Sequence, residues 1–125
     1  MAFKFNERRK ARTPWDNPMK FGNTVVKKKD LEGNILGEAN MDGSIHVDNS
    51  VDLDSPMGKR VVAHEQSHVE DIQSGRASYD DESVTWEGKK YPRSNGKIFY
   101  NFKWYKEGDN NLPWEAKAIQ AEKRV

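Results

Sequence analysis

One short segment constrains this chain more than any other feature. The letters HEQSH at positions 64–68 place two of the three histidines four residues apart, with a glutamate after the first. At 100° per residue on a helix, His64, Glu65 and His68 fall on the same arc as the neighbouring valines. Polar groups on a core-facing arc are costly unless something satisfies them. We therefore expect the fold to bury this segment and to supply partners for its three polar side chains.

Signals at both ends delimit the segment as a helix. Ser55 is a typical N-cap, Pro56 suits the first helical position, and Gly75 is a typical C-terminal stop. The sequence predicts a helix from Pro56 to Ser74. Its apolar arc would hold Val61, Val62, His64, Glu65, His68, Val69 and Ile72. We expect the opposite side, which includes Ala63, Ser67 and Asp71, to face out.

Short strands are predicted on both sides of this helix. Residues 24–48 have the pattern of a meander, with a turn at 31–34, a hairpin signal at Asp42-Gly43 and an alternating strand over 44–48. Residues 84–105 are aromatic and strand-like, with breaks expected at Gly88, Pro92 and Asn95-Gly96. A second helix is expected to open at 110–113 and to run towards the C-terminus. We predict an α+β domain in which antiparallel strands pack on both helices.

The N-terminal part of the chain differs from the rest in charge. Residues 1–29 hold nine Lys/Arg and two Asp/Glu, whereas the other 96 hold twelve and eighteen. Residues 1–23 show neither helical nor strand period, so we predict an extended basic arm with aromatic anchors, followed by one domain over 24–125. We expect the arm to bind the body of the chain or a protein partner. Nucleic-acid binding by the arm is the last-ranked alternative, because the body is acidic.

Composition narrows the class of protein further. The chain has 125 residues, 34% of them hydrophobic and 33% charged, which leaves room for one modest core. It has no cysteine, which excludes disulfides and thiolate metal ligands. No apolar run reaches the roughly 18 residues of a transmembrane helix, and the N-terminus lacks the apolar region of a signal peptide. We therefore expect a soluble protein without membrane contact.

A divalent metal ion can satisfy the two inward histidines. Histidines at i and i+4 lie one turn apart on one face, so two imidazoles can converge on a tetrahedral Zn²⁺. Glu65 would lie beside them, placed to take a proton from a metal-bound water. The alternative is a pair of core histidines bonded to backbone carbonyls, with Glu65 paired with a cation.

A catalytic zinc ion usually takes a third protein ligand. His46 is the only other histidine of the chain, and we expect it to line a cleft or to face solvent. The predicted C-terminal helix offers Glu115 and Glu122 on its apolar arc. Glu115 lies in the first turn and is the preferred ligand, while Glu122 can support a ligand imidazole instead. Both can also be ordinary helix carboxylates.

The motifs VVAHEQSH at 61–68 and LPWEA at 112–116 resemble those of the gluzincin branch of the zincin metallopeptidases. They are more closely similar to small zincin-like proteins of bacteria and tailed phages, over roughly residues 43–125. The resemblance implies a zincin-like domain with bound Zn²⁺, held by His64, His68 and Glu115, and with Glu65 as general base. The chain departs from it at Ile119, where many gluzincins have an acidic residue.

Two functions follow as expectations. The first is a zinc-dependent peptidase acting on a peptide or protein, in which the strand 44–48 is the sheet edge that receives the substrate. Its oxyanion would be stabilised by one of Tyr79, Tyr91, Tyr100, Tyr105 and His46. The alternative is a structural or assembly component of a larger particle such as a phage virion, with or without hydrolase activity. Either function places the protein in the cytoplasm or in a virion.

Overall fold

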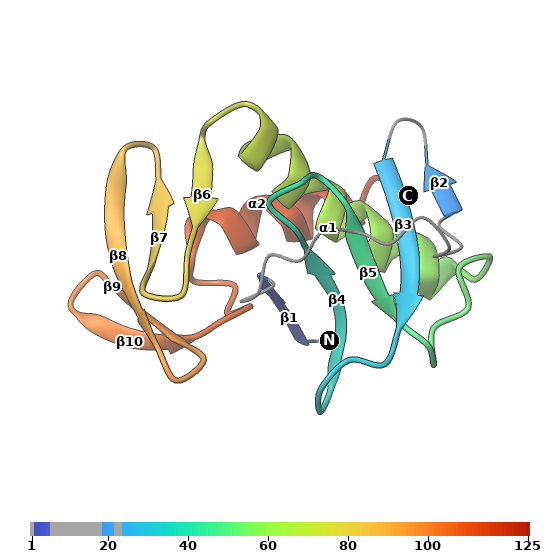
Figure 1. Cartoon of the computed structure of the whole chain (residues 1–125), viewed down its shortest axis with the longest axis horizontal. Coiled ribbons are helices and arrows are strands. Elements are labelled where there is room, and N and C mark those ends of the chain that lie inside the picture. The colour runs from blue at the N-terminus through green and yellow to red at the C-terminus, as the bar shows by residue number, and fades with distance from the viewer. Residues whose placement is uncertain (1, 6–18, 22–23) are drawn as a thin grey trace.

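A computed structural model describes residues 2–5, 19–21 and 24–125, which form two helices and two five-stranded sheets (Figure 1). The chain is α+β, as predicted. The first sheet contains β1 (Ala2–Phe5), β2 (Met19–Phe21), β3 (Thr24–Lys29), β4 (Ile35–Ala39) and β5 (Ile45–Asp48). Helix α1 (Pro56–Gln73) leads to β6 (Ala77–Tyr79), β7 (Ser83–Trp86), β8 (Lys89–Ser94), β9 (Lys97–Tyr100) and β10 (Lys103–Lys106), and then to α2 (Pro113–Glu122).

The first sheet differs from the predicted meander in one pairing. Its strand order is β1-β4-β5-β3-β2, and β5 pairs antiparallel with β4 but parallel with β3. The turn at 31–34 therefore crosses over one strand position instead of closing a hairpin. The prediction that the strand 44–48 is a sheet edge is wrong, because β5 has a neighbour on each side. Burial explains its central place, since Ile45 and Val47 are fully buried.

The described parts of the segment 1–23 are strands at the two edges of this sheet. β1 pairs in parallel with β4, and β2 pairs antiparallel with β3. The expectation of a segment without strands is therefore wrong for residues 2–5 and 19–21. The aromatic side chains expected to anchor it, those of Phe3, Phe5, Trp15 and Phe21, lie outside the described part of the structure. The division into an arm and a domain stays a prediction.

Helix α1 begins and ends within one residue of its predicted bounds. The hydroxyl of Ser55 accepts a hydrogen bond from the backbone N–H of Gly58 at 3.0 Å, and Pro56 occupies the first turn. The helix ends before Gly75, whose φ of 80° places it in the left-handed region. The valines of α1 pack on the inner face of the first sheet, against Val26, Ile45 and Val47. This first core fixes which side of α1 faces the sheet.

One side of α1 that was expected to face out is buried. Ala63, Ser67 and Asp71 have little exposed surface, because α2 packs along this side of the helix. The ammonium of Lys117 on α2 lies 2.9 Å from the Asp71 carboxylate. The prediction that Ala63, Ser67 and Asp71 face out is therefore wrong.

The second sheet is an antiparallel meander of order β10-β9-β8-β7-β6. Its turns at Gly88 and Asn95-Gly96 confirm two of the expected breaks, whereas Pro92 lies within β8 and does not break it. The inner face carries a second core that includes Val84, Trp86, Ile98, Leu112 and Trp114. In Figure 1, α1 runs behind the strands of the first sheet, and much of α2 lies between the two sheets. No helix within the described ranges is long and apolar enough to span a membrane.

Candidate metal centre

Two histidines of α1 converge on one carboxylate of α2. The Nε2 atoms of His64 and His68 lie 2.8 and 3.1 Å from Oε1 of Glu115. The two rings are 5.0 Å apart and nearly perpendicular, at 75°. His64, His68 and Glu115 are only 1%, 2% and 2% exposed. The structure thus brings together the three residues that the sequence suggested as metal ligands.

The position of Glu115 depends on the residue before it. Trp114 is 1% exposed and packs into the aromatic core of the second sheet. Its ring lies 6.0 Å from that of Trp86, 5.9 Å from that of Tyr91 and 6.2 Å from that of Tyr100. Adjacent helical residues point in directions about 100° apart, so anchoring Trp114 directs Glu115 towards α1. The second sheet therefore holds the carboxylate in place.

The three side chains have the spacing of a metal centre. Their candidate ligand atoms all lie within 4.8 Å of one another. Around a tetrahedral ion with bonds of about 2.0–2.1 Å, ligand atoms are roughly 3.3 Å apart. The two histidine Nε2 atoms, at 2.8 and 3.1 Å from Oε1 of Glu115, are within about 0.5 Å of that separation. The group can hold a metal ion, and three protein ligands leave one tetrahedral position open.

A second carboxylate contacts the other side of the His64 ring. Oε2 of Glu122 lies 2.7 Å from Nδ1 of His64. A neutral imidazole has one N–H and can donate to only one of two carboxylates. If Nδ1–H donates to Glu122, Nε2 carries a lone pair directed at the centre, which is the tautomer that a metal ligand needs. Glu122 thus lies where an outer carboxylate orients a ligand histidine. Ile119, one turn earlier on α2, is apolar and cannot take this role.

The surroundings of Glu115 keep its carboxyl group ionised, the state that binds a cation. Burial acts to raise the pKa of this carboxyl. The positive charge of His68 and hydrogen bonds from both histidines outweigh burial and lower the pKa to about 2. Glu115 is therefore an anion at neutral pH.

Glu65 is in the opposite situation. It is fully buried, and neither carboxylate oxygen has a hydrogen-bond partner within the described residues. Burial raises its pKa well above the ordinary value of 4.5, and the negative charges of Glu115, Glu38 and Glu122 raise it further. An unbonded buried carboxyl costs stability. A core with a purely structural role would not be expected to bury such a carboxyl beside His64, His68 and Glu115.

A glycine makes room for Glu65. A Cβ atom on Gly37 of β4 would lie 3.0 Å from Cγ and 3.1 Å from Oε2 of Glu65. It would also lie 3.0 Å from Val61. Gly37 was not among the residues predicted to shape the site, although a glycine next to the strand residues Ile35 and Leu36 is a signal of close backbone approach. Gly37 therefore allows α1 to approach β4 closely next to Glu65.

Other residues expected near the site have different roles. Nδ1 of His46 lies 2.9 Å from Glu38 on β4, and its strand neighbours Ile45 and Val47 face α1, so His46 points to the other face of the sheet. The hydroxyl of Tyr79 donates to the carbonyl of Ala39 at 2.9 Å. The remaining tyrosines, Tyr91, Tyr100 and Tyr105, pack against the second core. The oxyanion group stays a prediction.

Comparison of the chain with protein-family models, with curated proteins and with solved structures finds no match. The similarity of its motifs to those of gluzincins therefore stays a prediction. The chemistry of the site has to be inferred from its own residues.

Replacing the His64, His68 and Glu115 side chains should remove metal binding. We expect His64→Ala and Glu115→Gln to abolish tight binding of Zn²⁺. Glu122→Gln should weaken it by about 10–100-fold, because only the orientation of a ligand is lost. Competition with a chromophoric chelator measures these affinities. Glu70→Gln, an exposed carboxylate on α1, is the control, and a Glu115→Gln variant with parental affinity would contradict the assignment.

Glu65→Gln should stabilise the metal-free protein at neutral pH. The folded state holds the Glu65 proton more tightly than the unfolded state, so stability falls as pH rises above about 4.5 towards the folded pKa. The substitution should recover about 1.4 kcal/mol per pH unit over that interval. Urea unfolding at pH 7 and pH 4 measures the difference, which should vanish at pH 4. An equal or lower stability of the variant at pH 7 would show that Glu65 is satisfied.

Proposed function

We propose that this chain is a zinc-dependent peptidase of a zincin-like type, with His64, His68 and Glu115 as metal ligands and Glu65 as general base. The observation that carries the proposal is the pairing of two unlike carboxyls in one buried centre. Glu115 is held between two imidazoles, while Glu65 lies beside them with no hydrogen bond from the described residues. Carboxyl groups whose environments drive their pKa values apart are typical of acid–base sites.

The ligand set supports zinc as the metal. Two imidazole nitrogens and one carboxylate oxygen form a borderline donor set, and a Zn²⁺ site of three protein ligands is typical of catalysis. A bound Zn²⁺ would lower the pKa of water and polarise a substrate carbonyl. Glu115 and the imidazoles would hold the ion, and Glu122 would orient His64.

Glu65 would move the proton. A carboxyl with a raised pKa holds a proton more readily than an exposed one, so it can take a proton from water and release it to the leaving amine. A structural glutamate whose carboxylate accepts hydrogen bonds would have a lowered pKa and would hold a proton less readily. The empty hydrogen-bonding capacity of Glu65 is thus available to water and substrate.

A peptide substrate needs an approach to this buried centre. Strand β4 closely approaches Glu65 at Gly37, and its outer edge is paired with β1. Phe3 of β1 is the register partner of Gly37. An extended peptide that adds to β4 would therefore have to take the place of β1. We infer that residues 2–5 hold the substrate position in the free protein.

The alternative is an assembly component in which the metal only stabilises the fold. The nearly complete burial of His64, Glu65, His68 and Glu115 favours this function, because a working site must admit substrate. In that case zinc would raise the melting temperature without producing cleavage.

Catalysis is tested directly with the full chain loaded with Zn²⁺. We expect it to cleave members of a peptide library. Glu65→Gln should lower the rate by about 10²–10⁴-fold, because general-base assistance is lost, while zinc remains bound. Mass spectrometry detects the products, and zinc content is measured on the same samples. Glu70→Gln should cleave like the parent, and cleavage that survives in Glu65→Gln would disprove the role of Glu65.

Deleting residues 1–5 should increase cleavage. Removing β1 frees the edge of β4 for a peptide, so the specificity constant should rise while zinc affinity is unchanged. Steady-state assays of the shortened and full chains measure this, with thermal melts to verify folding. A folded, zinc-loaded short chain that cleaves no faster would exclude β1 from the substrate position.

A further inference from the structure

The positive charge of the body is concentrated in the second sheet. Residues 88–106 hold six Lys/Arg, six aromatic residues and no Asp/Glu, whereas residues 30–125 as a whole have eighteen Asp/Glu and twelve Lys/Arg. Half of the basic residues of that larger range therefore lie in β8, β9, β10 and their turns. An overall acidic charge does not describe this part of the molecule.

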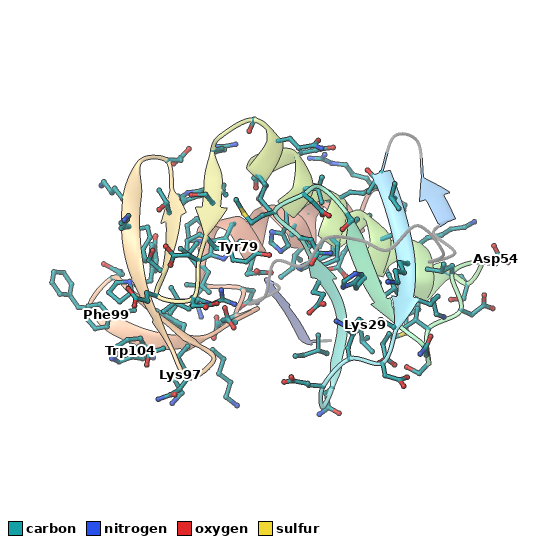
Figure 2. The ribbon with its side chains drawn as sticks, viewed as in Figure 1. Lys29, Asp54, Tyr79, Lys97, Phe99 and Trp104 are labelled. Atoms are coloured by element: carbon teal, nitrogen blue, oxygen red, sulfur yellow. The ribbon has the colours of Figure 1, made fainter. Side chains whose placement is uncertain are left out.

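Strand register places the half-buried Phe99 and the exposed Trp104 on one face of the sheet. Ile98 is buried in the second core, so Phe99 and Lys97 point to the outer face of β9. Phe99 is paired with Trp104 of β10, and Lys97 with Lys106. The Phe99 and Trp104 rings are 5.2 Å apart, and Trp104 is 46% exposed. Figure 2 shows Lys97, Phe99 and Trp104 at the end of the molecule formed by β9 and β10.

The same face continues onto β8. Ser94 is paired with Lys97 and shares its side of the sheet. Lys90 is paired with Thr85, which alternates with the buried Val84 and Trp86 and therefore also points out. We call the side chains of Lys90, Ser94, Lys97, Phe99, Trp104 and Lys106 the outer face. It combines a central aromatic pair with three lysines.

Two local features of this hairpin destabilise the folded protein when no ligand is bound. Lys97 and Lys106 are direct cross-strand partners, and like charges in such pairs are destabilising. The β9–β10 turn also places Phe102 at a φ of 66°, a region that favours glycine, and leaves its ring 93% exposed. An anionic ligand with flat apolar groups would relieve the charge repulsion and cover the rings.

We propose that the outer face binds single-stranded nucleic acid. Unpaired bases stack on exposed aromatic rings, and lysines along the same surface bind the backbone phosphates. A duplex hides its bases, so it would use the lysines but not the rings. A membrane would favour rings grouped at one depth, whereas Phe99 and Trp104 lie within a sheet face beside Ser94 and the lysines. The observations therefore favour a single strand.

Fluorescence anisotropy with the full-length, zinc-loaded chain tests this proposal. The probes are labelled dT and rU oligonucleotides of 12 residues and a duplex of equal length. We expect the single strands to bind more tightly than the duplex, with an affinity that falls steeply between 50 and 200 mM salt. Absence of binding to either single strand at 50 mM salt would overturn the proposal.

Variants of the outer face separate stacking from charge. Trp104→Ala should weaken single-strand binding by roughly 5- to 100-fold, the range expected for one stacked base. Trp104→Phe should retain most of the affinity, and Lys97→Ala should reduce both affinity and salt dependence. Lys59→Ala, an exposed lysine on α1, is the control and should bind like the parent.

Other occupants give different results. Binding that is unchanged in both Trp104→Ala and Lys97→Ala would place the nucleic acid elsewhere and overturn the proposal. Sedimentation with phosphatidylserine vesicles that depends on Trp104, without oligonucleotide binding, would identify a membrane surface instead. Glu65→Gln should bind the single strands like the parent, so this proposal does not depend on the peptidase. Thermal melts of each variant verify that the sheet is folded.

Discussion

The fold depends on the contact between two imidazoles of α1 and the Glu115 carboxylate of α2. These residues are 47 to 51 positions apart in sequence, yet they meet in a centre that is almost completely buried. Helix α1 belongs to the first core through its valines, and α2 belongs to the second core through Trp114. The centre is thus the seam between the two cores. Because apolar packing is non-directional, this polar contact, together with the Lys117–Asp71 ion pair, sets the register of one helix against the other.

Charge explains why such a seam would hold a cation. Glu65, Glu115 and Glu122 surround two imidazoles, so the carboxylates outnumber the histidines. Burial and the neighbouring carboxylates raise the pKa of Glu65, so that it tends to keep its proton. The charge of His68 and hydrogen bonds from both histidines lower the pKa of Glu115 in spite of its burial. One divalent ion would replace the protons shared by Glu115 and the histidines, and would leave Glu65 as the group able to gain or lose one.

The features that were predicted correctly from the sequence are those that depend on interactions within a single helix. The Ser55 cap, the four-residue spacing of the histidines and the first-turn position of Glu115 all depend on one helix at a time. The central place of β5, the burial of Asp71 and the role of Gly37 depend on which element packs against which. Asp71 is buried only because Lys117 arrives from α2, and Gly37 matters only because Glu65 lies opposite. The partner of His46 depends on the sheet in the same way, because Glu38 is its neighbour on β4.

The second sheet separates two roles through the alternation of its strands. On β9, Ile98 and Tyr100 face the core that holds Trp114, whereas Phe99 between them points outwards. Trp114 in turn fixes the start of α2 and therefore the position of Glu115. A change at Phe99 or Trp104 alters the exposed surface without removing a side chain from the aromatic core. The candidate metal centre and the outer face can consequently vary independently, although a single hairpin contributes to both.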